Sequence, residues 1–164
     1  MLAASAAALP LLLGAAGCRS SDAFTGPDPL AGPPPLSADV RALLAAVTAE
    51  QQLIYLYKKT MRVYSALTPA LGTLLAEHQA HLAQLRARII EPPGKTVPVA
   101  APARRPIAGT PAAALARLRT AEQAAIAAQL RRLAGASPSL AQLYASIAAS
   151  EATHVAALDS RLHG

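Results

Sequence analysis

The chain has 164 residues, of which 53% are hydrophobic and 3% aromatic, with one cysteine, no tryptophan and a formal net charge of +6. This length allows one modest domain once an N-terminal export segment is set aside, and a lone cysteine excludes an internal disulfide. Alanine and leucine dominate from Ser37 onward while β-branched residues are sparse, a composition that favours helices over sheets.

The positive charge permits binding to nucleic acid, anionic lipid or acidic cell-wall polymers. The arginines, however, are scattered at spacings typical of solvated helix faces, and they lack the interleaved aromatic residues of a base-stacking surface. Examples are Arg86, Arg88, Arg117, Arg119, Arg131 and Arg132. We therefore expect no nucleic-acid partner.

The N-terminus begins with an uncharged apolar run, Met1–Ala16, which has the length of a signal peptide and is too short to span a membrane. Its end, Leu-Leu-Leu-Gly-Ala-Ala-Gly at 11–17, resembles a bacterial lipobox. The resemblance implies that residues 1–17 are a lipoprotein signal peptide and that Cys18 becomes lipidated, which anchors the exported chain at the outer face of the plasma membrane. An ordinary cleaved signal followed by an incidental Cys18 stays open.

Residues 18–36 are rich in proline, glycine and serine, a composition that cannot bury a core. They are predicted to be a disordered tether that holds a folded domain, residues 37–164, off the membrane.

Four helical segments follow, each preceded by a capping hydroxyl residue. Ser37 is predicted to cap the first, which runs to about Tyr64. The next three begin with a hydroxyl residue followed by proline, an order that suits the N-cap and the first helical position. These pairs are Thr68-Pro69, Thr110-Pro111 and Ser137-Pro138.

The second helix is predicted to stop near residues 91–94, Glu-Pro-Pro-Gly, because a double proline removes backbone donors. The connector that follows, up to Gly109, has about 18 residues and can reach roughly 60 Å. A helix of about 24 residues is only about 36 Å long. We therefore expect two short-looped antiparallel hairpins joined by one long Pro-rich crossover, an all-α four-helix bundle.

Each helix carries ionisable residues within its own apolar stripe, about 15–20 Å from its start. Because antiparallel helices of similar length meet level near mid-height, these residues are predicted to converge at the middle of the bundle. They are Glu50, His78, His81, Glu122, Glu151 and His154. Buried glutamates need compensation by cations, hydrogen bonds or metal, and carboxylates with imidazoles are usual ligands for iron, manganese or zinc.

The order of these residues resembles that of the ferritin-like superfamily. Glu151-Ala152-Thr153-His154 matches the Glu-x-x-His motif of its di-iron proteins, and Glu50 and Glu122 match the single glutamates of two other helices. The second helix departs from the pattern, because His78 stands where a bridging glutamate is expected. Glu77 is a possible further metal ligand, but it can reach inward only from the edge of the stripe. This His-x-x-His variant is similar to uncharacterised exported actinobacterial ferritin-like domain proteins.

The resemblance implies a ferritin-like fold and a metal-binding protein with oxidase, storage or stress-protective roles. The candidate ligands are compatible with a single ion and also with a pair of loosely held divalent ions. The cofactor is then iron, manganese or zinc, or none. If metal binds, Tyr57 and Tyr144 are candidate hydrogen-bond donors to the ligands or redox-active neighbours; otherwise they fill the core.

The alternative is a metal-free polar core, in which Glu and His pair with each other and fix the helix register. The protein is then a non-catalytic envelope module that binds a protein or an anionic polymer. A homodimer is compatible with either interpretation, and the sequence identifies no protein partner. The sequence has no Gly-rich phosphate loop, nucleophile elbow or Cys-x-x-Cys motif, so nucleotide chemistry and acyl transfer have no support.

Overall fold

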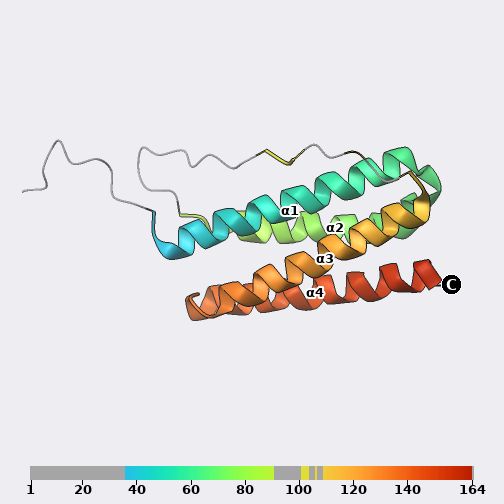
Figure 1. Cartoon of the computed structure of the whole chain (residues 1–164). Helices are drawn as coiled ribbons and strands as arrows, with labels where there is room; N and C mark the ends of the chain where they lie inside the picture. The colour runs from blue at the N-terminus through green and yellow to red at the C-terminus, as the bar shows by residue number, and fades with distance from the viewer. Residues whose placement is uncertain (1–35, 91–100, 104–105, 107–108, 164) are drawn as a thin grey trace, which may run out of the picture. The chain divides into compact units, whose positions relative to one another are not determined.

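The computed structural model describes residues 36–90, 101–103, 106 and 109–163 (Figure 1). These residues form four α-helices and one short 3₁₀ helix and contain no strand. The helices belong to one compact unit, Leu36–Gly164. The prediction of an all-α four-helix bundle is therefore confirmed.

The predicted signal peptide, the lipidation of Cys18 and nearly all of the tether lie outside the described residues. No helix in the described part of the chain is both long enough and apolar enough to cross a membrane.

Helix α1 spans Ala38–Val63 and begins as the sequence predicts. Ser37 is its N-cap, and the Oγ atom of this residue accepts a hydrogen bond from the backbone N–H of Val40 at 3.2 Å. Asp39 in the first turn and Arg62 in the last turn both have the charge that suits the helix dipole.

Helix α2 spans Thr68–Ala87, and its start corrects one prediction. Thr68 is not the N-cap, because the 3₁₀ helix η2 (Ser65–Leu67) leads directly into α2 and gives Thr68 helical dihedral angles of φ −56° and ψ −47°. Leu67 takes the N-cap position, and no side chain caps the helix. The hydroxyl of Thr68 therefore does not perform the predicted role.

Helices α3 (Pro111–Leu133) and α4 (Pro138–His163) begin at the predicted prolines. The Oγ1 atom of Thr110 accepts a hydrogen bond from the N–H of Ala113 at 3.2 Å, which confirms Thr110 as the N-cap of α3. Proline is tolerated in the first turn because the backbone N–H groups of that turn have no acceptor within the helix.

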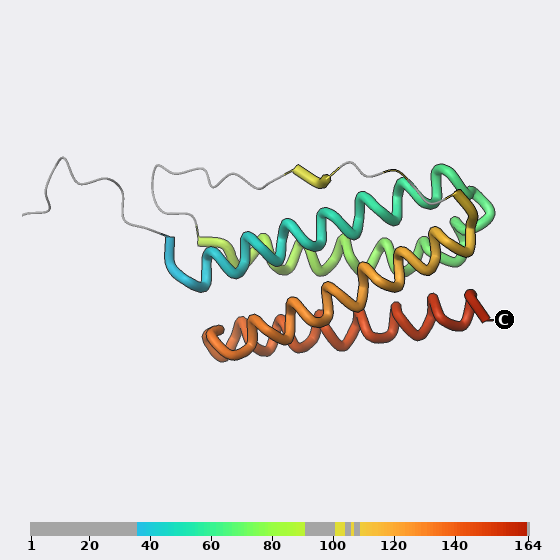
Figure 2. The backbone as a smooth tube through the Cα atoms, viewed as in Figure 1, coloured from blue at the N-terminus to red at the C-terminus, as the bar shows by residue number. Residues whose placement is uncertain are grey.

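The helices pair as α1 with α2 and α3 with α4, and the two pairs pack through α1 against α3 and α2 against α4. Figures 1 and 2 show that the chain direction reverses between α1 and α2 and again between α3 and α4. Helices α2 and α3 run in the same direction, so the segment between them leads from one end of the bundle to the other.

Part of that connecting segment is hydrogen-bonded to the middle of α1. The backbone N–H of Ala103 donates to Oε1 of Gln52 at 2.6 Å, and Nε2 of Gln52 donates to the carbonyl of Ala103 at 3.3 Å. This two-way contact holds the described residues 101–103 along α1.

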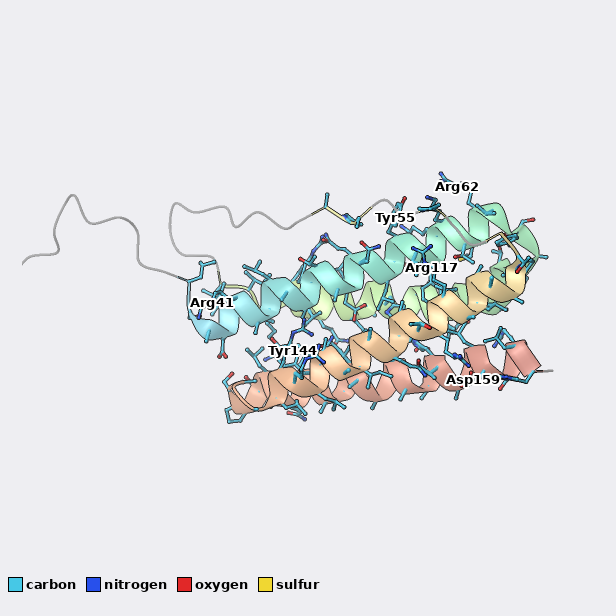
Figure 3. The ribbon with its side chains drawn as sticks, in the orientation of Figure 1. Arg41, Tyr55, Arg62, Arg117, Tyr144 and Asp159 are labelled. Atoms are coloured by element: carbon cyan, nitrogen blue, oxygen red, sulfur yellow. The ribbon has the colours of Figure 1, made fainter. Side chains whose placement is uncertain are left out.

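The interior contains two apolar clusters, one toward each end of the bundle. The first packs Leu43 and Val47 of α1 against Leu85 of α2 and residues of α4 that include Tyr144. The second comprises Leu56, Tyr57, Leu71, Leu74, Leu115, Leu118 and Leu158. In Figure 3, Tyr144 lies toward the end where α1 begins, and Asp159 lies toward the opposite end. The buried ionisable residues occupy the level between the two clusters.

The two Thr-Pro pairs provide a matched test of the helix starts. Thr110→Ala removes a cap hydrogen bond and is expected to lower the free energy of unfolding by about 1 kcal/mol. Thr68→Ala changes a residue that caps nothing and is expected to alter it by no more than a few tenths of a kcal/mol. Thermal unfolding of both variants measures the difference, and equal losses would contradict the assignment of Leu67 as the N-cap of α2.

Candidate metal centre

All six predicted ionisable residues are buried, and the contacts and charge interactions among them place them in one cluster. Five of them have an exposed fraction of 0%, and His81 has 8%. Every helix contributes: Glu50 from α1, His78 and His81 from α2, Glu122 from α3, and Glu151 and His154 from α4.

His78 lies between two carboxylates. Its Nδ1 is 2.9 Å from Oε2 of Glu50, and its Nε2 is 2.8 Å from Oε1 of Glu122. Burial by itself lowers the pKa of His78, but the hydrogen bonds to Glu122 and Glu50 outweigh it and raise the pKa to about 9. In the metal-free protein at neutral pH, His78 is therefore an imidazolium that donates from both ring nitrogens.

The two carboxylates are held in their ionised form. Burial raises the pKa of each, but the neighbouring histidines outweigh it: His78 and His81 lower the pKa of Glu50, and His154 and His78 lower that of Glu122 to about 2. The hydroxyl of Tyr57 also donates to Oε1 of Glu122 at 2.6 Å. Burial and the charge of Glu122 raise the pKa of Tyr57, so Tyr57 stays a neutral donor.

His154 faces both His78 and the edge of the cluster. Its Nδ1 is 3.2 Å from Nε2 of His78 and 3.5 Å from Oε1 of Glu122, while its Nε2 is 2.7 Å from Oε2 of Glu77. Glu77 thus reaches inward from the edge of α2, and its pKa is lowered chiefly by the hydrogen bond with His154. The Oγ of Ser150 donates to the same Glu77 oxygen at 3.2 Å.

Ser150 is a participant that the sequence argument does not name. It precedes His154 by four positions, which places both residues on one face of α4. That spacing was available in the sequence, but a serine on a helix usually hydrogen-bonds to its own backbone, so only the position of Glu77 gives it a role.

Glu151 is buried without a hydrogen-bond partner on either carboxylate oxygen among the described residues. Burial and the charges of Glu50 and Glu122 raise its pKa to about 8, so it is mostly protonated at neutral pH. The hydroxyl of Tyr144 also lacks a partner in the described part of the chain. The structure therefore gives Tyr57 a hydrogen bond to a candidate ligand and gives Tyr144 none.

Within the described part of the chain, two groups of side chains can hold a metal ion, and they share His78. The Glu50 group contains Glu50, His78 and His81, and the Glu122 group contains His78, Glu122 and His154; in each, the ligand atoms lie within 4.8 Å of one another. His163 lies at the exposed C-terminal end of α4 and belongs to neither group.

The residues fit a divalent metal ion by their chemistry. Carboxylate oxygens and imidazole nitrogens are the ligands that iron, manganese and zinc accept. Several buried atoms of the cluster also lack hydrogen-bond partners among the described residues: Oε1 of Glu50, Oε2 of Glu122, Nδ1 of His81 and both oxygens of Glu151. Buried polar atoms without partners are costly, and a bound cation would satisfy such acceptors.

Comparisons of the chain with protein-family models, with curated proteins and with solved structures find no match.

Glu151 provides a test of the electrostatics of the metal-free cluster. Its pKa is about 8 in the folded protein, whereas the ordinary value is 4.5. Between these two pH values the folded state therefore keeps a proton that the unfolded state has lost. Stability is therefore lost as pH rises from 4.5 to 8. Glu151→Gln removes this loss, and the variant is expected to gain in unfolding temperature over the wild type as pH rises, by ~5 °C or more at pH 8.

The measurement is thermal unfolding in chelator across pH 4.5–9. Glu77→Gln is the control, because Glu77 is half-buried and its pKa is lowered rather than raised, so no such gain is expected. A difference between Glu151→Gln and the wild type that stays constant with pH would show that Glu151 titrates normally.

Proposed function

We propose that this protein is an exported, lipid-anchored, ferritin-like protein whose mid-bundle Glu/His cluster binds a divalent iron, manganese or zinc ion. The observation that carries the proposal is the convergence of carboxylates and imidazoles from all four helices at one buried level, with several acceptor atoms left without partners among the described residues.

The chain directions support the ferritin-like part of the proposal. The chain forms two hairpins, α1–α2 and α3–α4, and the end of α2 and the start of α3 lie at opposite ends of the bundle (Figure 2). That arrangement is the one expected of ferritin-like bundles. The presence of His78 in place of a bridging glutamate is the departure, and it makes the centre less anionic than a four-glutamate di-iron centre.

The surroundings suit a reactive metal. An iron or manganese ion would supply one-electron redox chemistry, and zinc would supply a Lewis acid. The chain itself contributes two apolar clusters that keep bulk water away from the centre and a Tyr57 hydroxyl that orients Glu122. These features are compatible with the oxidase or stress-protective roles of ferritin-like proteins.

A second candidate function is the metal-free envelope module that binds a protein or an anionic polymer. The observation in its favour is that His78 already neutralises Glu50 and Glu122 through contacts of 2.9 and 2.8 Å. A buried cluster of this kind can serve only to fix the register of the helices. What this alternative leaves unexplained is Oε2 of Glu122, which is buried without a hydrogen-bond partner among the described residues.

Metal content distinguishes the two functions. The full chain, purified in mild detergent without metal affinity, is expected to contain at least one iron, manganese or zinc ion per chain by mass spectrometry, after reconstitution if necessary. Glu122→Ala and His154→Ala each remove a ligand and are expected to lower the content to a tenth or less. His163→Ala, an exposed histidine outside the cluster, is the control and should keep full content.

Absence of bound metal in the wild type after reconstitution would refute the metal-binding proposal and favour the metal-free module. Circular dichroism of each variant checks that the bundle is folded, so that loss of metal is not mistaken for loss of structure.

A further inference from the structure

The two candidate groups compete for one imidazole ring. His78 presents Nδ1 to Glu50 and Nε2 to Glu122. A neutral imidazole has one lone pair for a metal and one N–H, so a neutral His78 can serve only one of the two groups as a ligand. The surroundings of each nitrogen decide which group that is.

The Glu122 group has its ligand atoms at separations that suit one ion. Nε2 of His78 lies 2.8 Å from Oε1 of Glu122 and 3.2 Å from Nδ1 of His154, and the last two atoms are 3.5 Å apart. Atoms bound to one ion at about 2.0–2.2 Å lie roughly 3–3.6 Å from each other when adjacent. Little movement is needed for all three to bind one ion.

Both histidines of the Glu122 group also form a hydrogen bond with a carboxylate through their other ring nitrogen. Nδ1 of His78 donates to Glu50 at 2.9 Å, and Nε2 of His154 donates to Glu77 at 2.7 Å. Metal-binding histidines usually donate their other N–H to a carboxylate, which fixes the tautomer and the orientation of the ring. Here those two hydrogen bonds leave Nε2 of His78 and Nδ1 of His154 as the metal-facing atoms.

The Glu50 group lacks this support. Its two contacts are made by different oxygens of Glu50, at 2.9 Å to His78 and 3.5 Å to His81. Nδ1 of His81 has no hydrogen bond among the described residues, and no carboxylate in that part of the chain pairs with its other nitrogen. His81 is therefore not oriented for binding metal as His154 is.

We infer that the cluster holds a single divalent ion on His78 Nε2, Glu122 and His154 Nδ1, with Glu50 and Glu77 as positioning residues behind the two histidines. The inference rests on the proposed metal-binding function and specifies its ligands. Two imidazoles and one carboxylate leave coordination positions open for a small ligand, as in two-histidine, one-carboxylate iron sites. His81 is outside this ligand set.

Matched histidine variants test the ligand set. The full chain is stripped of metal, loaded with less than one equivalent of Cu²⁺ as the probe, and examined by pulsed electron paramagnetic resonance, which counts coordinated imidazoles. We expect two in the wild type, two in His81→Asn and at most one in His154→Asn. Zn²⁺ titration by calorimetry is expected to give one ion per chain for the wild type and for His81→Asn.

The positioning role of Glu77 is tested by a conservative pair. Glu77→Leu removes the acceptor for His154 and is expected to weaken Zn²⁺ binding by about 10–100-fold. Glu77→Gln keeps an amide oxygen that can accept the same hydrogen bond and is expected to recover most of that loss. Because Glu77 is half-buried at the edge of the bundle, both variants should fold.

The outcomes distinguish a failure of metal binding from a failure of the inferred ligand set. No Cu²⁺ or Zn²⁺ bound to the wild type would refute metal binding itself. Three results would leave metal binding intact but overturn the single-ion ligand set. They are three coordinated imidazoles in the wild type, two ions bound per chain, or the loss of one imidazole in His81→Asn. If His154→Asn does not fold, the His81→Asn spectrum and the Glu77 pair still decide the question.

Discussion

The double hydrogen bond of His78 is the interaction on which the middle of this bundle depends. Two ionised glutamates, Glu50 and Glu122, are fully buried on helices from different hairpins, and the imidazolium between them is the cation that compensates both. Removing one partner of such an arrangement leaves a buried charge unpaired, which is strongly destabilising. The ring therefore joins α1, α2 and α3 at one height, and through His154 it also meets α4.

The apolar clusters give this polar level its surroundings. One cluster lies toward each end of the bundle, so the charges are kept from bulk solvent along the axis, where water would otherwise weaken their mutual attraction. The same burial accounts for the opposite behaviour of Glu151. It has no imidazole or hydroxyl partner among the described residues, and the neighbouring charges of Glu50 and Glu122 oppose its ionisation, so its pKa rises while theirs fall.

Much of the fold follows from local sequence signals, and the exceptions have physical causes. Ser37 and Thr110 cap helices as predicted, but Thr68 does not, because a 3₁₀ turn already places it in helical geometry. Helical periodicity also predicts which Glu and His residues are buried, since all six fall on apolar stripes. The individual hydrogen bonds could not be predicted, because they depend on side-chain rotamers. At the edge of the stripe, for example, the sequence does not show that Glu77 pairs with His154 or that Ser150 donates to the same carboxylate.

The identity of residue 78 affects what the bundle does without metal. A glutamate there would place another buried carboxylate beside Glu50 and Glu122 with no imidazolium to compensate them, so burial would be tolerable only with bound cations. Histidine instead carries a proton whose charge compensates Glu50 and Glu122 when no metal is bound. The proton on its Nε2 lies where Glu122 and His154 converge. A divalent ion on these three ligands would take the position of that proton while the contact from Nδ1 to Glu50 is kept. His78 thus compensates the buried charges of Glu50 and Glu122 when no metal is bound, and in the proposed ligand set the same ring provides one of the three ligands of the single ion.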